Sequence, residues 1–397
     1  MSQQQKPLTA FAVLSAAAAS MALPVADAQA EARPDERVIS YRNSQYQEDD
    51  APASRTFNGV TDRYSVNVHQ LGFDTPIADD WYLTSELQYE TMSGASPMQT
   101  YENSDGQSVL VMSGASIDDT RIDLKLAPTR YFEQGTVGGS VAISSENDYQ
   151  SLAAGVNGSL ALFNDMATLQ GGVSLAHDTL SPTDPELSTA RQQADGATKT
   201  TVSLFQGVSL VLNKDSALNL GLVATHSSGY LSDPYKTDDR RPDSRAMLAL
   251  SSRYRHYLRW GPGQENGWHL DARWYQDDWS VRSQTLTTRL VSRWTGVHWR
   301  FELTPMLRYY RQSQAAFYGL EQTPDANNPH SSDARLSTYG ALALGLSSEL
   351  GWKAWSLSLD YQTYDASEGL ALVGDTDKET PGLVDYQLFS LGVSYQY

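Results

Sequence analysis

Apolar and charged side chains alternate over twelve residues within the stretch 298–318, HWRFELTPMLRYYRQSQAAFY. One alternate set is Trp299, Phe301, Leu303, Pro305, Leu307 and Tyr309, and the other is Arg300, Glu302, Thr304, Met306, Arg308 and Tyr310. Successive side chains of a strand point to opposite faces, so a strand here has one apolar and one charged face. Its length is unusual for a soluble protein but suits a tilted strand across a bilayer. The stretch predicts a strand with lipid on one side and a polar lumen on the other, although Pro305 withholds one ladder hydrogen bond.

The bulk composition is consistent with a membrane protein built from strands. Among 397 residues, 40% are hydrophobic and the mean hydropathy is −0.45, and beyond the N-terminus no apolar run approaches the roughly 20 residues of a spanning helix. The chain has no cysteine, which excludes disulfides, thiolate metal sites and an acylated N-terminal cysteine. A net charge of −18 argues against a nucleic-acid partner, and its simplest role is solubility of the loops.

The N-terminal residues 1–30 have the organisation of a secretory signal peptide. Lys6 is followed by an Ala-rich apolar core over 8–23, which is too short to span a bilayer. Ala28-Gln29-Ala30 fits a small-x-small cleavage site, with Ala26-Asp27-Ala28 as the alternative. We therefore expect a signal peptide over 1–30 and a single barrel domain over 31–397.

About sixteen segments of the chain alternate with a period of two, and the first two are the weakest. They are 38–46, 64–73, 81–89, 121–126, 137–143, 152–162, 167–175, 202–212, 218–224, 246–258, 268–274, 286–294, 299–310, 336–346, 355–363 and 389–397. No longer helical period competes with them. The fold class predicted is an all-β, transmembrane, antiparallel up-and-down barrel of about 16 strands, with 14 as the alternative if the first pair stays outside.

The connections between these segments alternate between short and mostly long. The short set is 76–80, 163–165, 213–216, 262–266, 295–297 and 351–353, and the long set is 93–116, 179–199, 227–244, 312–334 and 366–384. Seven of the nine tryptophans lie at strand ends beside the short set: Trp81, Trp260, Trp268, Trp294, Trp299, Trp352 and Trp355. Outer-membrane barrels have short periplasmic turns, longer external loops and aromatic girdles, so we predict the bacterial outer membrane. A soluble sandwich would not explain why the tryptophans choose one side.

The last segment ends in alternating Phe389, Leu391, Val393, Tyr395 and Tyr397. A final aromatic residue in such a strand resembles the insertion signal of outer-membrane proteins. We therefore expect the outer-membrane assembly machinery and outer-membrane lipid as partners, and a periplasmic protein partner stays open.

Several stretches resemble the family called domain of unknown function 3570. They are Ser93-Gly94-Ala95-Ser96-Pro97, the octapeptide 229–236 (GYLSDPYK), the pentapeptide 241–245 (RPDSR), and Arg308-Tyr309-Tyr310 continuing to Gln312-Ser313 and Phe317-Tyr318. The resemblance covers nearly the whole mature chain and implies an envelope location and a barrel. It supplies no activity and no catalytic residue.

The motif positions fall in or beside the long connections. The external-loop candidates are Ser93, Asp233, Tyr235, Lys236, Arg241 and Arg245. One hypothesis is a binding surface or constriction built from in-folding loops. The other is that Pro and Gly shape the turns while Asp and Arg tie the loops to the wall.

The phase of the strands assigns their charges mostly to the lumen. The inward set on the tenth to thirteenth segments is Arg245, Arg253, Arg255, Arg273, Arg289, Arg293, Arg300 and Arg308, against two acids, Asp271 and Glu302. Glu86 and Glu90 lie on the third strand, which is opposite the eleventh in a ring of sixteen, and the strand beside it is mixed. One hypothesis is a pore with a basic wall facing an acidic wall, which would favour anions. The other is that acidic loops plug the lumen and pair with the arginines.

No metal, cofactor or catalytic motif is present. The histidines show no ligand spacing, and His177-Asp178 and His226-Ser227 resemble catalytic pairs no more than chance allows. We therefore expect no enzyme, no cofactor and no metal site. The functional hypotheses are an outer-membrane channel or transport protein for a small polar or anionic solute and, as the alternative, a non-conducting envelope scaffold or binding protein.

Overall fold

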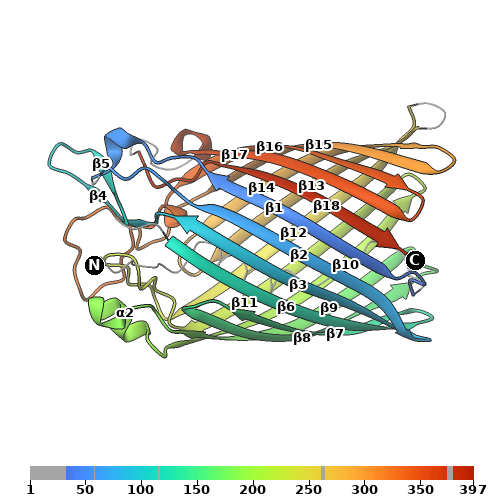
Figure 1. Cartoon of the computed structure of the whole chain (residues 1–397), viewed down its shortest axis with the longest axis horizontal. Helices are drawn as coiled ribbons and strands as arrows, with labels where there is room; N and C mark the ends of the chain where they lie inside the picture. Colours follow the sequence, from blue (N-terminus) through green and yellow to red (C-terminus); the bar gives the residue numbers. More distant parts are fainter. Residues whose placement is uncertain (1–32, 58, 114–116, 261–263, 373–378) are drawn as a thin grey trace.

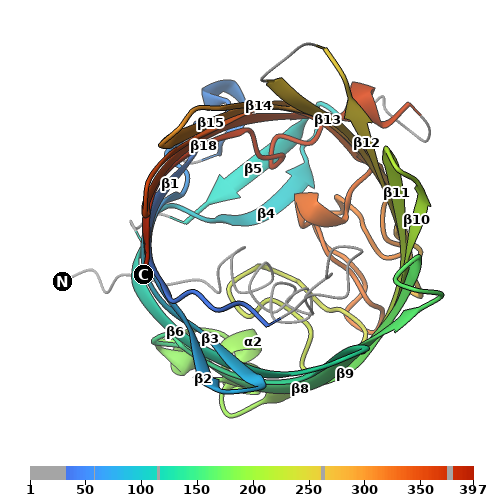
Figure 2. The ribbon, with the colours of Figure 1, turned by 90° about the vertical axis from the view of Figure 1, so that its right-hand side faces the viewer.

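In the computed structural model, sixteen strands of the described chain close into one antiparallel barrel (Figures 1 and 2). The described residues are 33–397 without 58, 114–116, 261–263 and 373–378, so the expected signal peptide lies outside them. The barrel strands are β1 (Val38–Glu48), β2 (Ser65–Ala78), β3 (Trp81–Gly94), β6 (Ile117–Phe132), β7 (Gly135–Ser145), β8 (Tyr149–Leu162), β9 (Ala167–Leu180), β10 (Thr198–Asn213), β11 (Ser216–Gly229), β12 (Ser244–Leu258), β13 (Gln264–Asp277), β14 (Arg282–Thr295), β15 (Trp299–Gln312), β16 (Tyr339–Trp352), β17 (Trp355–Ser367) and β18 (Tyr386–Gln396). Each corresponds to one predicted segment, which confirms the fold class.

The barrel closes between its first and last strands. β1 pairs with β18 in antiparallel register from Val38 opposite Gln396 to Glu48 opposite Tyr386. The amide of Arg37 continues this ladder to the carbonyl of Tyr397 at 3.1 Å. The weak first segment is therefore needed for closure, so the prediction of sixteen strands is confirmed and the alternative of fourteen is wrong.

The strands alternate between an apolar outer face and an inner face of small or polar side chains. On β16, Leu344 is 61% exposed on the outside, whereas Ala343 beside it is 1% exposed. Large apolar side chains with comparable exposure recur around the ring. Such a continuous apolar band is tolerated only where lipid or protein covers it, and a closed barrel satisfies the backbone polar groups of the strands internally.

The two ends of the barrel differ in their connections. At one end, called the turn end, consecutive strands are joined by short turns such as 79–80, 133–134, 214–215 and 353–354. At the other, the loop end, the connections 49–64, 95–116, 181–197, 230–243, 313–338 and 368–385 are long. Two loop-end connections, 146–148 and 278–281, are short. The seven tryptophans lie at or near the turn end, where an aromatic girdle was predicted.

The long connections contain structure that has no counterpart among the predicted segments. The connection 95–116 forms a second small sheet of β4 (Pro97–Glu102) and β5 (Ser108–Met112), which Figure 2 shows inside the ring of strands when viewed along the barrel. The short helices are η1 (Ala53–Arg55), η2 (Pro185–Leu187), α2 (Thr189–Ala194), η3 (Ala334–Leu336) and η4 (Glu368–Ala371). No helix of the described chain is long and apolar enough to cross a membrane.

Buried apolar clusters pack around the loops rather than through the lumen. One joins Leu110 and Met112 of β5 to Ala51 and Ala95, and another joins Trp279 and its neighbours to residues of the connection 313–338. The loop end therefore has small hydrophobic cores that hold separate connections together.

Some predicted boundaries are wrong by a few residues. β2 continues through Pro76 to Ala78, and β16 starts at Tyr339 because 334–336 form η3 instead. Most strands also extend several residues beyond the predicted segment toward the loop end. The outward side chains of these extra residues are polar, so the apolar alternation ends before the strand does. Pro305 behaves as expected: the pairing of β15 with β14 skips Thr304 and Pro305, while the pairing with β16 continues.

Candidate functional site

The inward arginines gather on four adjacent strands, β12 to β15. Because the apolar residues of these strands face outward, the period of two points the interleaved arginines into the lumen. They are Arg245, Arg253, Arg255, Arg273, Arg289, Arg293, Arg300 and Arg308. The structure thus brings together all eight arginines of the predicted inward set.

Some of these arginines share acids across neighbouring strands. Asp271 of β13 receives Arg255 at 2.5 Å on one oxygen and Arg289 at 2.6 Å on the other. Nearer the turn end, Arg293 pairs with Glu302 at 2.8 Å, and Arg300 pairs with Glu349. The side chains of these four arginines are 30–49% exposed, so solvent in the lumen reaches them and each pair contributes little to stability.

Three arginines of this wall make no ion pair with the described residues. Among the described residues, no carboxylate lies within ion-pair distance of Arg253, Arg273 or Arg308. The guanidinium of Arg273 lies 5.4 Å from the ring centroid of Tyr275, and the buried Nε of Arg308 lacks a hydrogen-bond partner in the described chain. The wall therefore keeps a surplus of positive charge, and we call these three residues the unpaired arginines.

Five inward tyrosines continue around the loop end of the barrel from the arginine wall. They are Tyr310, Tyr339, Tyr364, Tyr386 and Tyr46, on the consecutive strands β15, β16, β17, β18 and β1. Ring centroids are 5.7 Å apart for Tyr310 and Tyr339, and 4.8 Å apart for Tyr364 and Tyr386. Arg308 is one inward position from Tyr310 on the same strand. Aromatic rings and guanidiniums thus lie next to one another on this part of the inner wall.

The two acids predicted on the opposite wall have different surroundings. Glu90 of β3 is 3% exposed and pairs with Arg121 of β6 at 2.6 Å, so its charge is neutralised by the neighbouring strand. Glu86 accepts a hydrogen bond from Gln70 at 3.0 Å and is half-buried. β3 and β13 lie eight strands apart around the ring, so they face each other across the barrel as expected.

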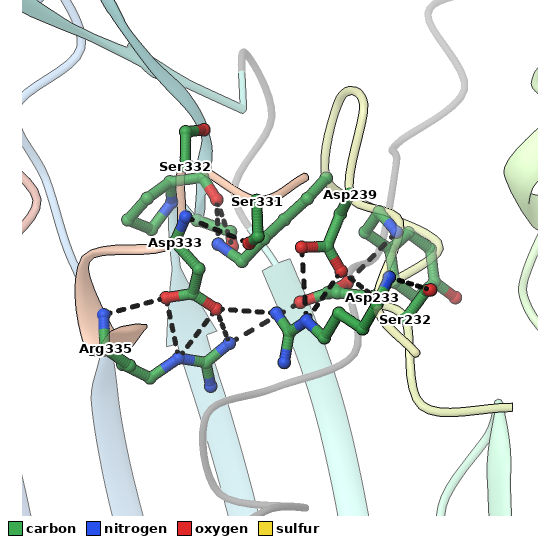
Figure 3. Close-up of polar contacts among 12 residues, drawn as sticks. Ser232, Asp233, Asp239, Ser331, Ser332, Asp333 and Arg335 are labelled. Carbon is green, nitrogen blue, oxygen red and sulfur yellow. Dashed lines mark hydrogen bonds and ion pairs between the residues drawn. The ribbon is translucent and has the colours of Figure 1, made fainter. Parts of the chain in front are cut away.

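At the loop end, a second group of charged residues joins the connections 230–243 and 313–338. Figure 3 labels Asp233, Asp239, Asp333 and Arg335 of this loop cluster, and Arg241 completes it. Arg241 lies between Asp239 and Asp333, at 2.9 Å from each. The Nε of Arg335 donates to Asp333 at 2.9 Å. The side chains of Asp239 and Asp333 are only 1% and 4% exposed, in contrast to the acids of the lumen wall.

Electrostatics in the loop cluster favours the ionised form of Asp333 in particular. Burial alone would raise the pKa of this carboxyl, but the guanidinium of Arg335 and the ammonium of Lys236 hold it well below its usual range. For Asp233 burial prevails, and its pKa is raised. Asp333 therefore remains the anion on which both arginines converge.

Other connections attach to the same region. Lys236 donates to the carbonyl of Pro97 at 2.7 Å, which links the connection 230–243 to β4. Arg63 pairs with Glu48 at 2.9 Å and donates to the carbonyl of Leu383 at 3.0 Å. A cavity of about 40 Å³ remains between these segments, enough for water to hydrate polar groups. Loops that are far apart in sequence thus form one polar assembly.

The loop-motif candidates do not all belong to this assembly. Asp233 and Arg241 lie in the loop cluster, and Lys236 and Tyr235 lie beside it. Arg245 instead pairs with Asp277 at 2.9 Å and covers the ring of Trp279. Ser93 is exposed on the outer face of β3, away from the cluster.

Sequence reasoning missed Asp333, Arg335 and Arg63, because no period or spacing connects them to their partners. The tyrosines could have been predicted from the sequence, because each occupies an inward position of its strand near the loop end. His177 and Asp178 point to opposite faces of β9, and Asp178 pairs with Lys199 at 2.9 Å. That adjacency therefore does not form a site.

Comparisons with known proteins agree with this architecture. A family model described as "Protein of unknown function (DUF3570)" matches residues 10–380, and no curated protein matches the chain. A bacterial polysaccharide outer membrane secretin is similar with a TM-score of 0.52 at 11% identity, covering 91% of this chain and 98% of that one. OccD3 (OpdP) from Pseudomonas aeruginosa gives 0.39 at 10% identity over 92% and 91%. CdiB from Acinetobacter baumannii gives 0.47 at 9% identity over 90% and 60%. At such identities the likeness concerns the fold, which is that of outer-membrane barrels.

Proposed function

This chain belongs to the DUF3570 family, and we propose that it is an outer-membrane channel or transport protein that passively admits a small polar solute, with anions favoured. The observation that carries the proposal is the solvent-reached arginine wall of β12–β15 with its three unpaired arginines. Fixed positive charge along a narrow lumen lowers the energy of anions inside it and raises that of cations.

The tyrosines and the arginine wall together favour an organic anion over a bare inorganic one. Aromatic faces contact the apolar surface of a solute, while the guanidiniums of Arg273 and Arg308 offer forked donors to a carboxylate or phosphate. Both kinds of group lie on the same side of the lumen, around β13–β18 and β1. A solute of that chemistry would contact both during passage.

Planar-bilayer recording of the purified protein tests this proposal. We expect channels with an anion-selective reversal potential in a KCl gradient, and we expect Arg308→Gln and Arg273→Gln each to shift it toward cations. Arg311→Gln is the matched control, because Arg311 belongs to the same strand as Arg308 but faces outward, where it donates to Gln284 at 2.6 Å. An intact fold without any channel activity would overturn the proposal.

A second candidate function is a non-conducting binding protein or scaffold whose lumen is closed by its own loops. The loop cluster favours it, since buried ion pairs tie 230–243 to 313–338. A silent wild-type protein that begins to conduct after Asp333→Asn would support this candidate. If the wild-type protein conducts, and conducts as well as the Asp333→Asn variant, this candidate is excluded.

The same geometry supports a proposal for the orientation of the barrel in the envelope. We propose that the turn end faces the periplasm and that the loop end faces outward. Seven tryptophans, the start of β1 and the end of β18 all lie at or near the turn end. The outward side chains Phe389, Leu391, Val393 and Tyr395 of β18 would then be available to the outer-membrane assembly machinery before the barrel closes. The mature chain is expected to occur in the outer-membrane fraction.

A further inference from the structure

Three buried acids meet at the loop end, on the side of the barrel near β6–β8. Asp119 belongs to β6, and Glu146 and Asp148 form the short connection between β7 and β8. One carboxylate oxygen from each lies within 4.8 Å of the others. These residues, which we call the acidic triad, are separate from the loop cluster and from the arginine wall.

The triad is buried and part of it has no partner. Asp119 and Asp148 are 3% and 1% exposed, and Glu146 is 9% exposed. Within the described chain, Oε2 of Glu146 and Oδ1 of Asp148 are removed from solvent and accept no hydrogen bond. An unsatisfied charged oxygen in such a place costs more than almost any other polar defect, unless a ligand satisfies it.

The positive charge that contacts the triad is shared with acids outside it. Arg121 is the cation that contacts it, at 3.3 Å from Glu146, but the same guanidinium also pairs with Glu90 and Asp123. One arginine therefore serves carboxylates on three sides. Burial, together with this crowding of acids, raises the pKa of Glu146 to about 8 and that of Asp148 to about 7.

Protein hydrogen-bond donors near the triad already bind other oxygens of its carboxylates. Oδ2 of Asp148 accepts from the hydroxyl of Tyr235 at 2.7 Å, and Oδ1 of Asp119 accepts from the amide of Asn147 at 2.7 Å. These bonds orient the side chains of Asp119 and Asp148, while Oδ1 of Asp148 accepts no hydrogen bond within the described chain. A rigid set of three carboxylates with orphaned oxygens is the donor set that hard divalent cations prefer.

We propose that Asp119, Glu146 and Asp148 bind a divalent cation, with Ca²⁺ as the ion, at the loop end of the barrel. Carboxylates at this spacing supply oxygens from three side chains, and water completes the coordination that Ca²⁺ accepts in flexible geometry.

The bound cation would also hold the loops. Tyr235 comes from the connection 230–243, and its hydroxyl accepts from the backbone amide of Thr183 at 3.0 Å while its ring receives Arg191 at 4.7 Å. The acid that this tyrosine contacts is Asp148. The site therefore connects the β7–β8 turn, through Tyr235, to two long connections, 181–197 and 230–243.

Calorimetric titration with Ca²⁺ tests the site on full-length mature protein refolded in detergent and stripped with EDTA. We expect binding of one ion per chain, and we expect Asp148→Asn and Glu146→Gln each to weaken it at least tenfold. Asp195→Asn is the control, since Asp195 is an exposed acid of a neighbouring connection and should leave the affinity unchanged. Equal affinities for wild type and both triad variants would overturn the proposal.

A second measurement uses the wild-type protein alone, in case a triad variant does not fold. Ligand that binds the folded state raises the midpoint of thermal unfolding by mass action. We expect Ca²⁺ to raise this midpoint and EDTA to reverse the change, with a smaller effect of Mg²⁺ because it demands closer octahedral geometry. The absence of any calcium-dependent shift would overturn the proposal without reference to channel activity.

Discussion

Two groups of arginines in this molecule have different environments and different roles. On the wall of β12–β15 its side chains are in contact with solvent and only partly paired, so their charge acts on whatever enters the lumen. In the loop cluster, Arg241 is 10% exposed and bound to two aspartates, so its charge is used within the protein. Arg241→Lys would not be conservative there, because a guanidinium bridges two carboxylates and an ammonium presents a single point charge.

Asp333→Asn tests the role of the loop cluster. Removing one partner of a buried ion pair costs about 3–5 kcal/mol, and we expect the low end here because Arg241 keeps its bond to Asp239. We expect the connection 313–338 to loosen while the barrel stays closed. The chain has no cysteine, so Ser331→Cys, at a position that is fully buried in the wild-type protein, reports the opening through its reaction with a maleimide.

The labelling rate should rise at least tenfold when Asp333→Asn is added to the Ser331→Cys background. Asp238→Asn is the matched control, since Asp238 is 41% exposed in its ion pair and its loss should not change the rate. Ser104→Cys, at an exposed position of the β4–β5 turn, calibrates the reagent. Unchanged protection in the Asp333→Asn background would show that apolar packing alone holds the connection.

At the level of elements, the strands could be predicted from the sequence because their outer and inner environments differ so strongly. The alternation of large and small side chains, as at Leu344 and Ala343, reflects that difference. The same alternation predicted which arginines point into the lumen. The partners of those arginines were harder to predict. Glu349 of β16 pairs with Arg300 of the adjacent strand β15, and predicting that pair requires the register between the two strands.

The connections could not be predicted in the same way. β4 and β5 lack a lipid face, so no period of two distinguishes them from coil. Arg241 and Asp333 are 92 residues apart, and their contact results from the packing of two loops. The same holds for the acidic triad, in which Asp119 meets a turn that lies beyond the next strand.

The assignment of the two faces leads to a prediction about neighbouring residues of β8. Val156 is 57% exposed on the outer face, and Asn157 points into the lumen. Arginine on the lipid face near the middle of a barrel costs about 2–4 kcal/mol, whereas in the lumen it keeps its hydration. We expect Val156→Arg to lower the free energy of unfolding in lipid vesicles by that amount and Asn157→Arg to change it much less.

Urea-induced unfolding in vesicles, followed by tryptophan fluorescence, measures both variants. Val156→Ala accounts for the loss of the valine side chain alone. Equal destabilisation by the two arginine substitutions would contradict the assignment of faces, whereas a reversed order would require the strand to be rotated by one residue.

At the level of the whole molecule, the net charge and the charge of the arginine wall of β12–β15 have opposite signs. The chain carries −18 overall, yet arginines dominate the inner faces of four adjacent strands. Many of the acids that make the net charge negative belong to loops and turns outside this wall, such as Asp333, Asp148 and Asp80. The electric field of a fixed charge in salt solution falls off over a Debye length. A solute inside the lumen therefore experiences the field of the nearby arginines rather than that of the net charge of the chain.

This separation predicts how selectivity depends on salt. The Debye length is about 10 Å at 0.1 M salt and about 3 Å at 1 M, so fixed arginines act across the lumen only in dilute salt. We expect the ratio of chloride to potassium permeability, measured from reversal potentials under a constant gradient, to be highest in dilute KCl and to approach the bulk ratio near 1 M. In Arg308→Gln the dilute-salt ratio should fall, and the two proteins should converge at high salt. If the ratio of the wild-type protein were independent of salt, size or specific contacts rather than the arginine field would control selectivity.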